Sequence, residues 1–324
     1  MPSSKNLPQQ HGILILNKPK GPTSAGCLER IKHVLGQKKI GHAGTLDPMA
    51  SGQLIVLLGR ATRLASYYAE GSKTYVGELL LGTTTETYDL EGRITAKQPW
   101  EQVTKSLLRA EVKGWLSQKV QVIPRYSAAK HQGSPLYKLS REGRKVPIKT
   151  KPLHVFQAEV ISVTLPKMRF RVSCGAGTYI RSLVHSLGIR IGCGAVLTEL
   201  IRERSHPFRL EEAYNLNVVL DEPDALPERI LSLSQALPHW STLLVGQATA
   251  QRLKYGAPVD AVGYLAPEEL PIPAVGADPI SIPDHQATAT RRTLVVTEDG
   301  QTQCLAELRR QDDKLVWVVL RGLW

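Results

Sequence analysis

The sequence has few cysteines and no long hydrophobic run. Its four cysteines, Cys27, Cys174, Cys193 and Cys304, are scattered, and none lies in a Cys-x-x-Cys pair. This spacing argues against a zinc ribbon and fits reduced thiols in a cytosolic protein. No run approaches about eighteen apolar residues, the length that a membrane-spanning helix needs. The polar N-terminus also lacks the apolar core of a signal peptide, so we expect a cytoplasmic protein with no membrane partner.

Motifs that bind phosphate groups, dinucleotides or metals are also absent. The chain contains no Gly-x-x-x-x-Gly-Lys-[Ser/Thr], no Gly-x-Gly-x-x-Gly and no His-x-x-x-His. Each of these patterns places backbone amides or imidazoles around a ligand. We therefore expect the protein to work without a nucleotide, metal or redox cofactor.

Positive charge is abundant but unevenly distributed along the chain. The formal net charge is +12. Residues 125–151 hold eight basic side chains and one acidic side chain, a net of +7, whereas residues 251–324 hold eight and ten, a net of −2. A solvated basic loop is one interpretation of such a segment. The tyrosines and glycines between its basic residues favour a mobile clamp on a phosphate backbone.

Apolar periodicity predicts an α+β fold with a mixed or antiparallel sheet. We expect strands at residues 12–17, 54–58, 73–81, 153–165, 168–174, 294–297 and 315–320. We expect helices at residues 24–35, 60–70, 100–112 and 178–187. Ser24 is the predicted cap of the first helix, Thr178 is the predicted cap of the last, and Gly188 is predicted to end it.

Residues 41–52 read GHAGTLDPMASG and are the most informative segment. Three glycines and a proline around one carboxylate exclude a regular helix or a central strand. The segment must therefore be a shaped loop, and such loops commonly carry reactive side chains. Asp47 lies between Leu46 and Pro48, where it can be aimed at a substrate. The alternative is a tight turn in which Asp47 makes only a turn hydrogen bond.

The pattern Gly-His-x-Gly-Thr-Leu-Asp-Pro-x-Ala-x-Gly at 41–52 resembles the catalytic motif of the TruB-type tRNA pseudouridine synthases. Three other blocks follow the order of that family: Asn-Lys-Pro-x-Gly-x-Thr-Ser at 17–24, Lys-x-Tyr at 73–75 followed by Leu-Gly-x-x-Thr-x-Thr-x-Asp at 81–89, and Gly-Thr-Tyr-Ile-Arg-Ser-Leu at 177–183. The resemblance implies an isomerase that converts the uridine at position 55 of the tRNA T-loop to pseudouridine, with no cofactor.

The resemblance also implies the catalytic residues. Asp47 is the catalytic carboxylate, and it attacks the uracil, attacks the sugar C1′ or deprotonates the sugar; the sequence leaves these routes open. Arg181 pairs with Asp47 and stabilises its ionised form. A cation in the first turn of a helix opposes the helix dipole, which is consistent with such a partner. Tyr75 is expected to stack on the target base and to act in proton transfer.

Other residues of the family motifs are expected to bind the substrate. Tyr179 and Leu200 complete the wall of the pocket, and His42 occupies the space that the flipped base leaves. Without the resemblance, Leu200 and Tyr75 would be interpreted as core residues and His42 as a turn residue.

Phosphate contacts are expected from Lys18 and from the basic segment. The segment resembles the thumb that closes over the T-arm in the family, and its expected phosphate-binding residues include Lys138, Arg141 and Arg144. Two departures from the family pattern affect the edges of the pocket. Ser205-His206-Pro207-Phe208 replaces a Ser-Gly-x-Phe type ending, and His185-Ser186 replaces an acidic pair.

The resemblance implies two domains. Residues 11–236 are expected to form a pseudouridine synthase catalytic domain, with the thumb inserted at 124–152. Residues 237–324 are expected to form a small, mostly-β PUA-like domain that contains a proline-rich loop at 266–290. Residues 1–10 are expected to be a disordered tail.

Two other functions fit the same features. One is an RNA-binding folding factor that opens and refolds tRNA. The other is a guide-dependent synthase that is one subunit of a ribonucleoprotein. The self-contained thumb disfavours a guide, so we expect a monomer that binds the T-arm stem-loop of tRNA without guide RNA.

Overall fold

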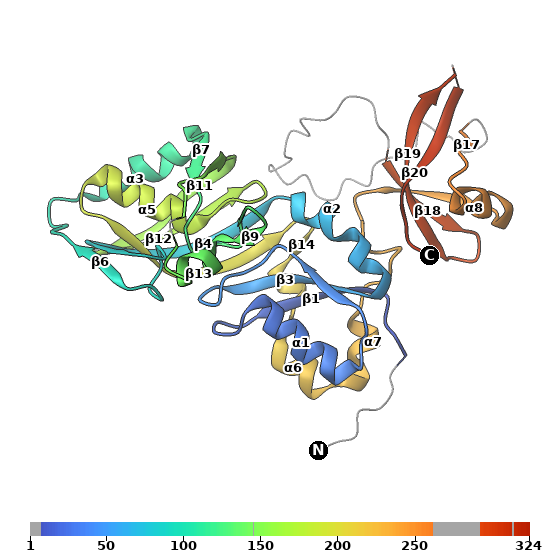
Figure 1. The fold of residues 1–324 in the computed structure, drawn as a ribbon, viewed down its shortest axis with the longest axis horizontal. Helices are drawn as coiled ribbons and strands as arrows, with labels where there is room; N and C mark the ends of the chain where they lie inside the picture. Colours follow the sequence, from blue (N-terminus) through green and yellow to red (C-terminus); the bar gives the residue numbers. More distant parts are fainter. Residues whose placement is uncertain (1–7, 145, 262–291, 313) are drawn as a thin grey trace.

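Two β-sheets organise the chain, a large one with helices on both faces and a smaller one near the C-terminus (Figure 1). The computed structural model describes residues 8–144, 146–261, 292–312 and 314–324. The predicted α+β architecture with a mixed sheet is confirmed. The proline-rich loop and most of the predicted N-terminal tail lie outside the described residues.

The large sheet is mixed. Its strands run in the spatial order β11 (Val155–Thr164), β12 (Lys167–Cys174), β4 (Lys73–Leu81), β13 (Ala195–Ser205), β3 (Ser51–Leu58), β1 (Gly12–Lys18) and β15 (Tyr214–Asn215), while β2 (Ile40–Ala43) pairs with β3 and β14 (Phe208–Arg209) pairs with β13. Strands β3 and β13 run parallel and pair over a short stretch that places Arg202 opposite Gly52. This pairing brings β13 next to the loop between β2 and β3.

Strand β1 is buried on both faces, which explains its continuous apolar sequence. Ile13 and Ile15 face one core, and Leu14 and Leu16 face another, as the alternation of a strand requires. One face is covered by α1 (Ser24–Leu35), α6 (Leu216–Asp221) and α7 (Leu226–Arg229). The other face is covered by α2 (Ala65–Glu70) and by strands of the C-terminal sheet.

The other half of the large sheet is covered by α3 (Lys105–Gly114) and α5 (Ile180–Ile191). Leu108 of α3 and Leu183 of α5 belong to one core cluster with Phe170 of β12. Helix α3 begins later than predicted because Thr104 is its N-cap and accepts a hydrogen bond from the Leu107 amide. The predicted strands at 73–81 and 168–174 are confirmed, and β12 pairs antiparallel with β11, which covers most of the predicted strand at 153–165.

The predicted cap of the first helix is wrong. Thr23 caps α1 through a 2.9 Å hydrogen bond from the Gly26 amide to its Oγ1. The Ser24 hydroxyl is turned inward, where it contacts Leu46 of the 41–52 loop. A sequence in which two capping residues are adjacent does not show which of them faces the helix end.

Both predicted ends of α5 are also wrong. Tyr179 has extended backbone angles at the N-cap, while Thr178 Oγ1 donates to the Gly175 carbonyl oxygen. The helix continues through Gly188. Only glycine fits at this position, because a Cβ there would lie 2.0 Å from the amide nitrogen of Ala195 at the start of β13. The helix ends at Gly192, whose φ of +93° suits glycine.

Residues 124–152, which we call the thumb segment, project from a short pairing of β7 (Val120–Val122) with β10 (Thr150–Pro152). The segment contains a small hairpin of β8 (Lys130–His131) and β9 (Ser134–Pro135), followed by α4 (Leu136–Arg141). The expectation that this segment is a phosphate-binding thumb stays a prediction.

The C-terminal sheet has the order β16 (Ser241–Val245), β18 (Arg292–Thr297), β19 (Thr302–Gln311), β20 (Lys314–Gly322) and β17 (Val259–Asp260), and α8 (Gln247–Lys254) packs on it. The predicted strands at 294–297 and 315–320 are present, but β19 was missed because charged residues interrupt its apolar pattern. Leu294 and Leu305 share a core cluster with Ile13 of β1. The domain boundary after residue 236 stays a prediction.

Candidate functional site

The loop between β2 and β3 carries Asp47 and has little freedom to move. Gly52 has a φ of +104°, and a Cβ there would lie 2.4 Å from the carbonyl oxygen of Arg202, so only glycine fits. The Ser24 hydroxyl accepts a 2.9 Å hydrogen bond from the Leu46 amide and donates a 3.0 Å bond to the Leu46 carbonyl oxygen. These contacts fix the residue directly before Asp47.

Lys18 supports the same loop from inside the protein. Its side chain is buried, and its Nζ donates to the carbonyl oxygens of Pro19 at 2.9 Å and Ala50 at 2.7 Å. Burial lowers the pKa of Lys18 below its usual value. The expected phosphate contact requires an exposed ammonium group, so this burial contradicts it. Lys18 instead holds the loop in place.

Arg202 joins the two ends of the loop. Its side chain is buried, its Nε donates to the Gln53 carbonyl oxygen at 2.7 Å, and its Nη2 donates to the Gly44 carbonyl oxygen at 2.9 Å. The guanidinium group carries its donors in a fixed plane, so one side chain fixes the spacing of two backbone segments. Arg202 also lies opposite Tyr75 in the pairing of β4 with β13.

Lys73 is a third buried cation at this site. Its Nζ donates to the carbonyl oxygens of Ala69 and Gly71, both at 2.6 Å. Burial, with a smaller effect of the nearby Arg202 charge, lowers the pKa of Lys73 to about 8. Lys73 therefore fixes the turn that leads into β4.

Arg181 and Asp47 form an ion pair, with 2.9 Å between Nε and Oδ2. The arginine side chain is 5% exposed and the aspartate side chain is 37% exposed. The guanidinium group is thus fixed within the protein, while the carboxylate stays open to a substrate. The predicted pairing is confirmed; the chemical roles of both residues stay predictions.

The other donors of Arg181 are also used. Nη1 donates to the Thr87 carbonyl oxygen at 2.9 Å, and Nη2 donates to the Tyr126 carbonyl oxygen at 3.1 Å. A second carboxylate, that of the buried Asp89, lies 3.5 Å from Nη1. Two carboxylates and two carbonyl groups thus compensate a cation in the first turn of α5, where the helix dipole disfavours it.

A pocket of about 240 Å³ opens beside this ion pair. Its lining includes five of the predicted site residues: Asp47, Tyr75, Tyr179, Arg181 and Leu200. Tyr75 is 8% exposed and Leu200 is 7% exposed. Burial raises the pKa of both Tyr75 and Tyr179, so both phenols are neutral near pH 7 and can donate hydrogen bonds.

Gln121 of β7 fixes the turn that carries Tyr179. Its Oε1 accepts a 2.8 Å hydrogen bond from the Tyr179 amide, and its Nε2 donates to the Gly177 carbonyl oxygen at 3.2 Å. Gln121 is buried between the base of the thumb segment and α5. The thumb is therefore connected directly to the wall of the pocket.

His42 lies on β2, opposite Val56 of β3, and does not line the pocket. It is half-buried, and its Nδ1 has no hydrogen-bond partner among the described residues. Burial and the Arg202 charge lower its pKa, so the imidazole is neutral near pH 7. Its expected place in the gap left by a flipped base stays a prediction.

The three predicted phosphate ligands of the thumb are exposed and lie outside the pocket of Asp47: Lys138, Arg141 and Arg144. The Arg141 guanidinium carbon lies 5.7 Å from the centre of the Tyr137 ring. Arg144 lies 3.9 Å from the Glu142 carboxylate, and its side chain is 64% exposed. Contacts of this kind are weak, so these cations stay available to a polyanion.

Three residues near this site had no role predicted from the sequence: Arg202, Lys73 and Asp89. A signal exists for two of them. Tyr75 and Lys73 lie two residues apart on β4, as Leu200 and Arg202 do on β13, so each pair shares a face of the sheet. A cation on the same face as a predicted pocket residue is a candidate for the same site.

Within the described ranges, no group of three or more His, Cys, Asp or Glu side chains is arranged to hold a metal ion. None of the described helices is long and apolar enough to cross a membrane.

Residues 32–180 match the family described as TruB family pseudouridylate synthase (N terminal domain). Two of the most similar curated relatives are both named tRNA pseudouridine synthase B. The relative from Nitratidesulfovibrio vulgaris is 52% identical over 319 residues, which cover 98% of this chain and 97% of the relative. The relative from Oleidesulfovibrio alaskensis is 51% identical over 323 residues, which cover 99% of each chain.

Solved structures share the fold at lower identity. A chain of "Structure of H/ACA RNP bound to a substrate RNA containing 2'-deoxyuridine" has a TM-score of 0.67 and 22% identity, with 100% of this chain and 91% of that chain covered. A chain of "Crystal structure of the archaeal box H/ACA sRNP Nop10-Cbf5 complex" has a TM-score of 0.66 and 24% identity, with 97% and 86% covered. At these identities the likeness shows the fold alone.

Proposed function

Because the chain belongs to the TruB family and is an isomerase of tRNA uridine, we propose that it converts the T-loop uridine at position 55 to pseudouridine as a stand-alone cytoplasmic enzyme. The observation that carries this proposal is the 2.9 Å ion pair of Asp47 with a buried Arg181 at the edge of a small pocket. An open carboxylate beside a fixed cation suits attack on a single base that has left its stack.

The reaction breaks the C1′–N1 bond, turns the uracil and joins it to the sugar through C5. It needs an ionised carboxylate but no oxidant, phosphate donor or metal. Asp47 supplies the carboxylate in each of the three routes that remain open: attack on the uracil, attack on C1′, or deprotonation of the sugar. Arg181 favours the ionised form and restricts which oxygen faces the substrate.

Tyr75, Tyr179 and Leu200 would hold the uracil in place. The two neutral phenols supply aromatic surface and hydrogen-bond donors, and Leu200 supplies an apolar contact. Tyr75 of β4 is paired directly with Arg202 of β13, and the guanidinium group of Arg202 also binds the loop that carries Asp47. The distance and orientation between Asp47 and Tyr75 would therefore stay fixed during the reaction.

Reaching the target requires the base to be flipped out of the T-loop, which costs a few kcal/mol. His42 lies on β2, five residues before Asp47, and is proposed to occupy the vacated space. Its neutral imidazole can stack on neighbouring bases without a charge that must be desolvated. The exposed cations of the thumb segment would contact the T-arm phosphates and supply much of the affinity.

A protein that only opens and refolds tRNA is a second candidate function, because base flipping itself disrupts RNA structure. A dependence on guide RNA is a third candidate. The thumb segment supports independence from a guide, because it gives the chain its own exposed basic surface. We propose that the protein acts as a monomer on free tRNA.

The test is to incubate the purified protein alone with an unmodified T-arm stem-loop transcript and to measure pseudouridine at each uridine. We expect conversion only at the position that corresponds to 55. Formation of pseudouridine only after a guide RNA is added would reject the stand-alone function. Binding without any pseudouridine would favour the folding factor.

A further inference from the structure

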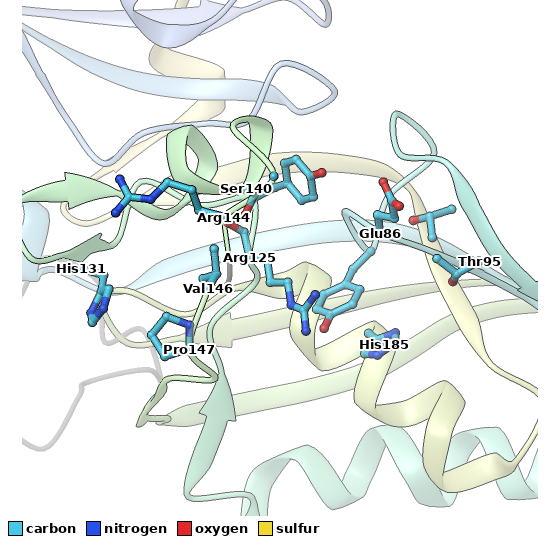
Figure 2. A pocket seen from close by; sticks show the side chains of 13 residues that line it. Glu86, Thr95, Arg125, His131, Ser140, Arg144, Val146, Pro147 and His185 are labelled. Atoms are coloured by element: carbon cyan, nitrogen blue, oxygen red, sulfur yellow. Dashed lines mark hydrogen bonds between the residues drawn. The ribbon is translucent and has the colours of Figure 1, made fainter.

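A second, larger cavity lies between the thumb segment and the region around β5 (Thr83–Thr85) and β6 (Ile94–Lys97). Its volume is about 1080 Å³, and it shares no lining residue with the pocket of Asp47. Figure 2 shows Arg125 extending from the thumb side of the cavity toward His185. Of the residues that line it, the function proposed above uses only exposed cations of the thumb segment, such as Arg144.

One wall of this cavity is a stacked pair of rings. The rings of Tyr88 and His185 are 3.8 Å apart and inclined by only 10°. Tyr88 has a φ of +66°, in the left-handed region that a bulky side chain rarely adopts. Strained backbone of this kind is concentrated at functional sites, where the surrounding structure maintains it. Here the residue with the positive φ, Tyr88, is also the one whose ring forms a flat aromatic surface at the edge of the cavity.

The facing wall is basic. Arg125 and Arg144 of the thumb segment are exposed and line the cavity, as does His131. One carboxylate also lines it, that of Glu86, and it is already paired with Arg93. Proteins that bind single-stranded nucleotides stack the bases on aromatic rings and bind the phosphates with guanidinium groups. This cavity has both kinds of group on facing walls.

The cavity lies next to the catalytic pocket. Helix α5 carries Arg181 into the first pocket and His185, one turn later, into the second, and one turn rises about 5.4 Å. Arg181 also donates to the carbonyl oxygen of Tyr126, which lines the second cavity. A step of one helical turn is comparable to the step between successive nucleotides of one strand.

We propose that this cavity is a second nucleotide-binding subsite. It receives a base that flanks the target uridine in the strand, with that base on the Tyr88–His185 pair and its phosphate near Arg125 or Arg144. The proposal rests on the proposed function, because the strand must already be opened at the target.

The test uses three T-arm stem-loops: one intact, one with an abasic residue 5′ of the target uridine, and one with an abasic residue 3′ of it. Binding is measured by fluorescence anisotropy in the Asp47→Asn background, which removes turnover. We expect one abasic RNA to bind about tenfold more weakly than the intact RNA, as the loss of one stacked base predicts. With His185→Ala added, that difference should disappear.

One further variant, with two controls, makes the test independent of α5. Arg125→Gln changes an exposed side chain and should weaken binding to all three RNAs alike, with a shallower salt dependence. His33→Ala and Arg109→Gln are the controls, since both residues are exposed on helices α1 and α3, which do not line the cavity. Neither control should alter the difference between intact and abasic RNA.

The proposal is overturned if neither abasic RNA binds more weakly, or if the weaker binding persists unchanged in His185→Ala. The proposed function itself is tested separately, by measuring whether the unmodified protein forms pseudouridine in the intact RNA. An enzyme that modifies the intact RNA but shows no His185-dependent effect refutes only the second subsite.

Discussion

The loop between β2 and β3 and the thumb segment use basic residues in opposite ways. Around the loop, the cations are buried and donate hydrogen bonds to backbone carbonyl oxygens: Lys18, Lys73 and Arg202. On the thumb segment, the cations are exposed: Lys138, Arg141 and Arg144. A count of charge along the sequence treats both groups alike.

Burial decides which use a cation can have. A buried ammonium or guanidinium group has lost its hydration and must keep its internal hydrogen bonds, so it fixes the geometry of the protein. An exposed cation keeps its water and can exchange it for phosphate, which releases counterions from the RNA. We therefore expect changes around the loop to affect chemistry and changes on the thumb segment to affect binding.

The largest effect on turnover among the basic residues is expected from Arg181→Lys. Lysine cannot reproduce the planar set of donors that contacts Asp47, Thr87 and Tyr126. We expect the single-turnover rate of pseudouridine formation to fall at least about 100-fold, with affinity for T-arm RNA little changed.

The matched control for that change is Arg190→Lys, which alters a partly exposed residue of the same helix. It should leave the rate within about twofold of the unmodified protein, as is usual for a surface change. Near-normal turnover by Arg181→Lys would show that the ion pair does not support catalysis.

Arg202→Lys is expected to have the next largest effect. A single ammonium group cannot hold both Gly44 and Gln53 at their present spacing, so the loop that carries Asp47 gains freedom. Small misplacements of a catalytic group cost up to about 100-fold, and we expect a 10- to 100-fold loss of the single-turnover rate at saturating RNA. The salt dependence of binding should stay the same.

The control is Arg169→Lys, which makes the same replacement at an exposed position of the same sheet. It shows whether an Arg-to-Lys change in this sheet lowers the rate wherever it is made. A change of salt dependence in Arg202→Lys would indicate that Arg202 contacts phosphate, which would break the contrast between the two regions.

A triple change of Lys138, Arg141 and Arg144 to Gln should act in the opposite way. We expect affinity for T-arm RNA to fall about tenfold or more, and the slope of log K against log salt to become shallower by about 2. The rate at saturating RNA should stay the same, because none of these residues lines the pocket of Asp47.

The control for this triple change removes three exposed cations from α3, namely Lys105, Arg109 and Lys113. Both proteins lose the same charge, so an equal effect of the two on the slope would mean that net charge, and not the thumb segment, drives binding.

The smallest effect expected is on the pH dependence of stability, through Lys73. Its pKa is about 8 in the folded protein, below the ordinary value of 10.5. Between these values the unfolded chain binds more protons than the folded chain, so this residue makes the free energy of unfolding rise with pH. From about pH 7.5 to about pH 9.5 we expect a gain of about 1–2 kcal/mol relative to Lys73→Met.

Urea denaturation of both proteins at the two pH values measures that difference. Parallel pH dependences of the two proteins would mean that Lys73 titrates normally despite its burial.

The sequence predicted the parts of the site that local motifs specify. Asp47 and Arg181 each lie in a dense motif, and the first-turn position of Arg181 on a helix already suggested a partner. The strand pattern also placed Tyr75 correctly in β4, whereas the strand that carries Leu200, β13, was not predicted.

Contacts between distant segments could not be predicted where no motif specifies both partners. Lys18 was expected to contact phosphate, and only the folded chain shows that its ammonium group donates to the Ala50 carbonyl oxygen. The bond of Arg202 to Gly44 joins residues 158 positions apart. Such pairings depend on the register of β3 against β13, which no local pattern encodes.

The most direct test of the division between chemistry and binding is Asp47→Asn, measured for both single-turnover pseudouridine formation and affinity for the T-arm stem-loop. We expect no detectable pseudouridine, which is at least about a thousandfold loss of rate. The dissociation constant should stay within about twofold of that of the unmodified protein, with an unchanged salt slope. Loss of RNA binding together with turnover, or turnover that survives the change, would contradict this division.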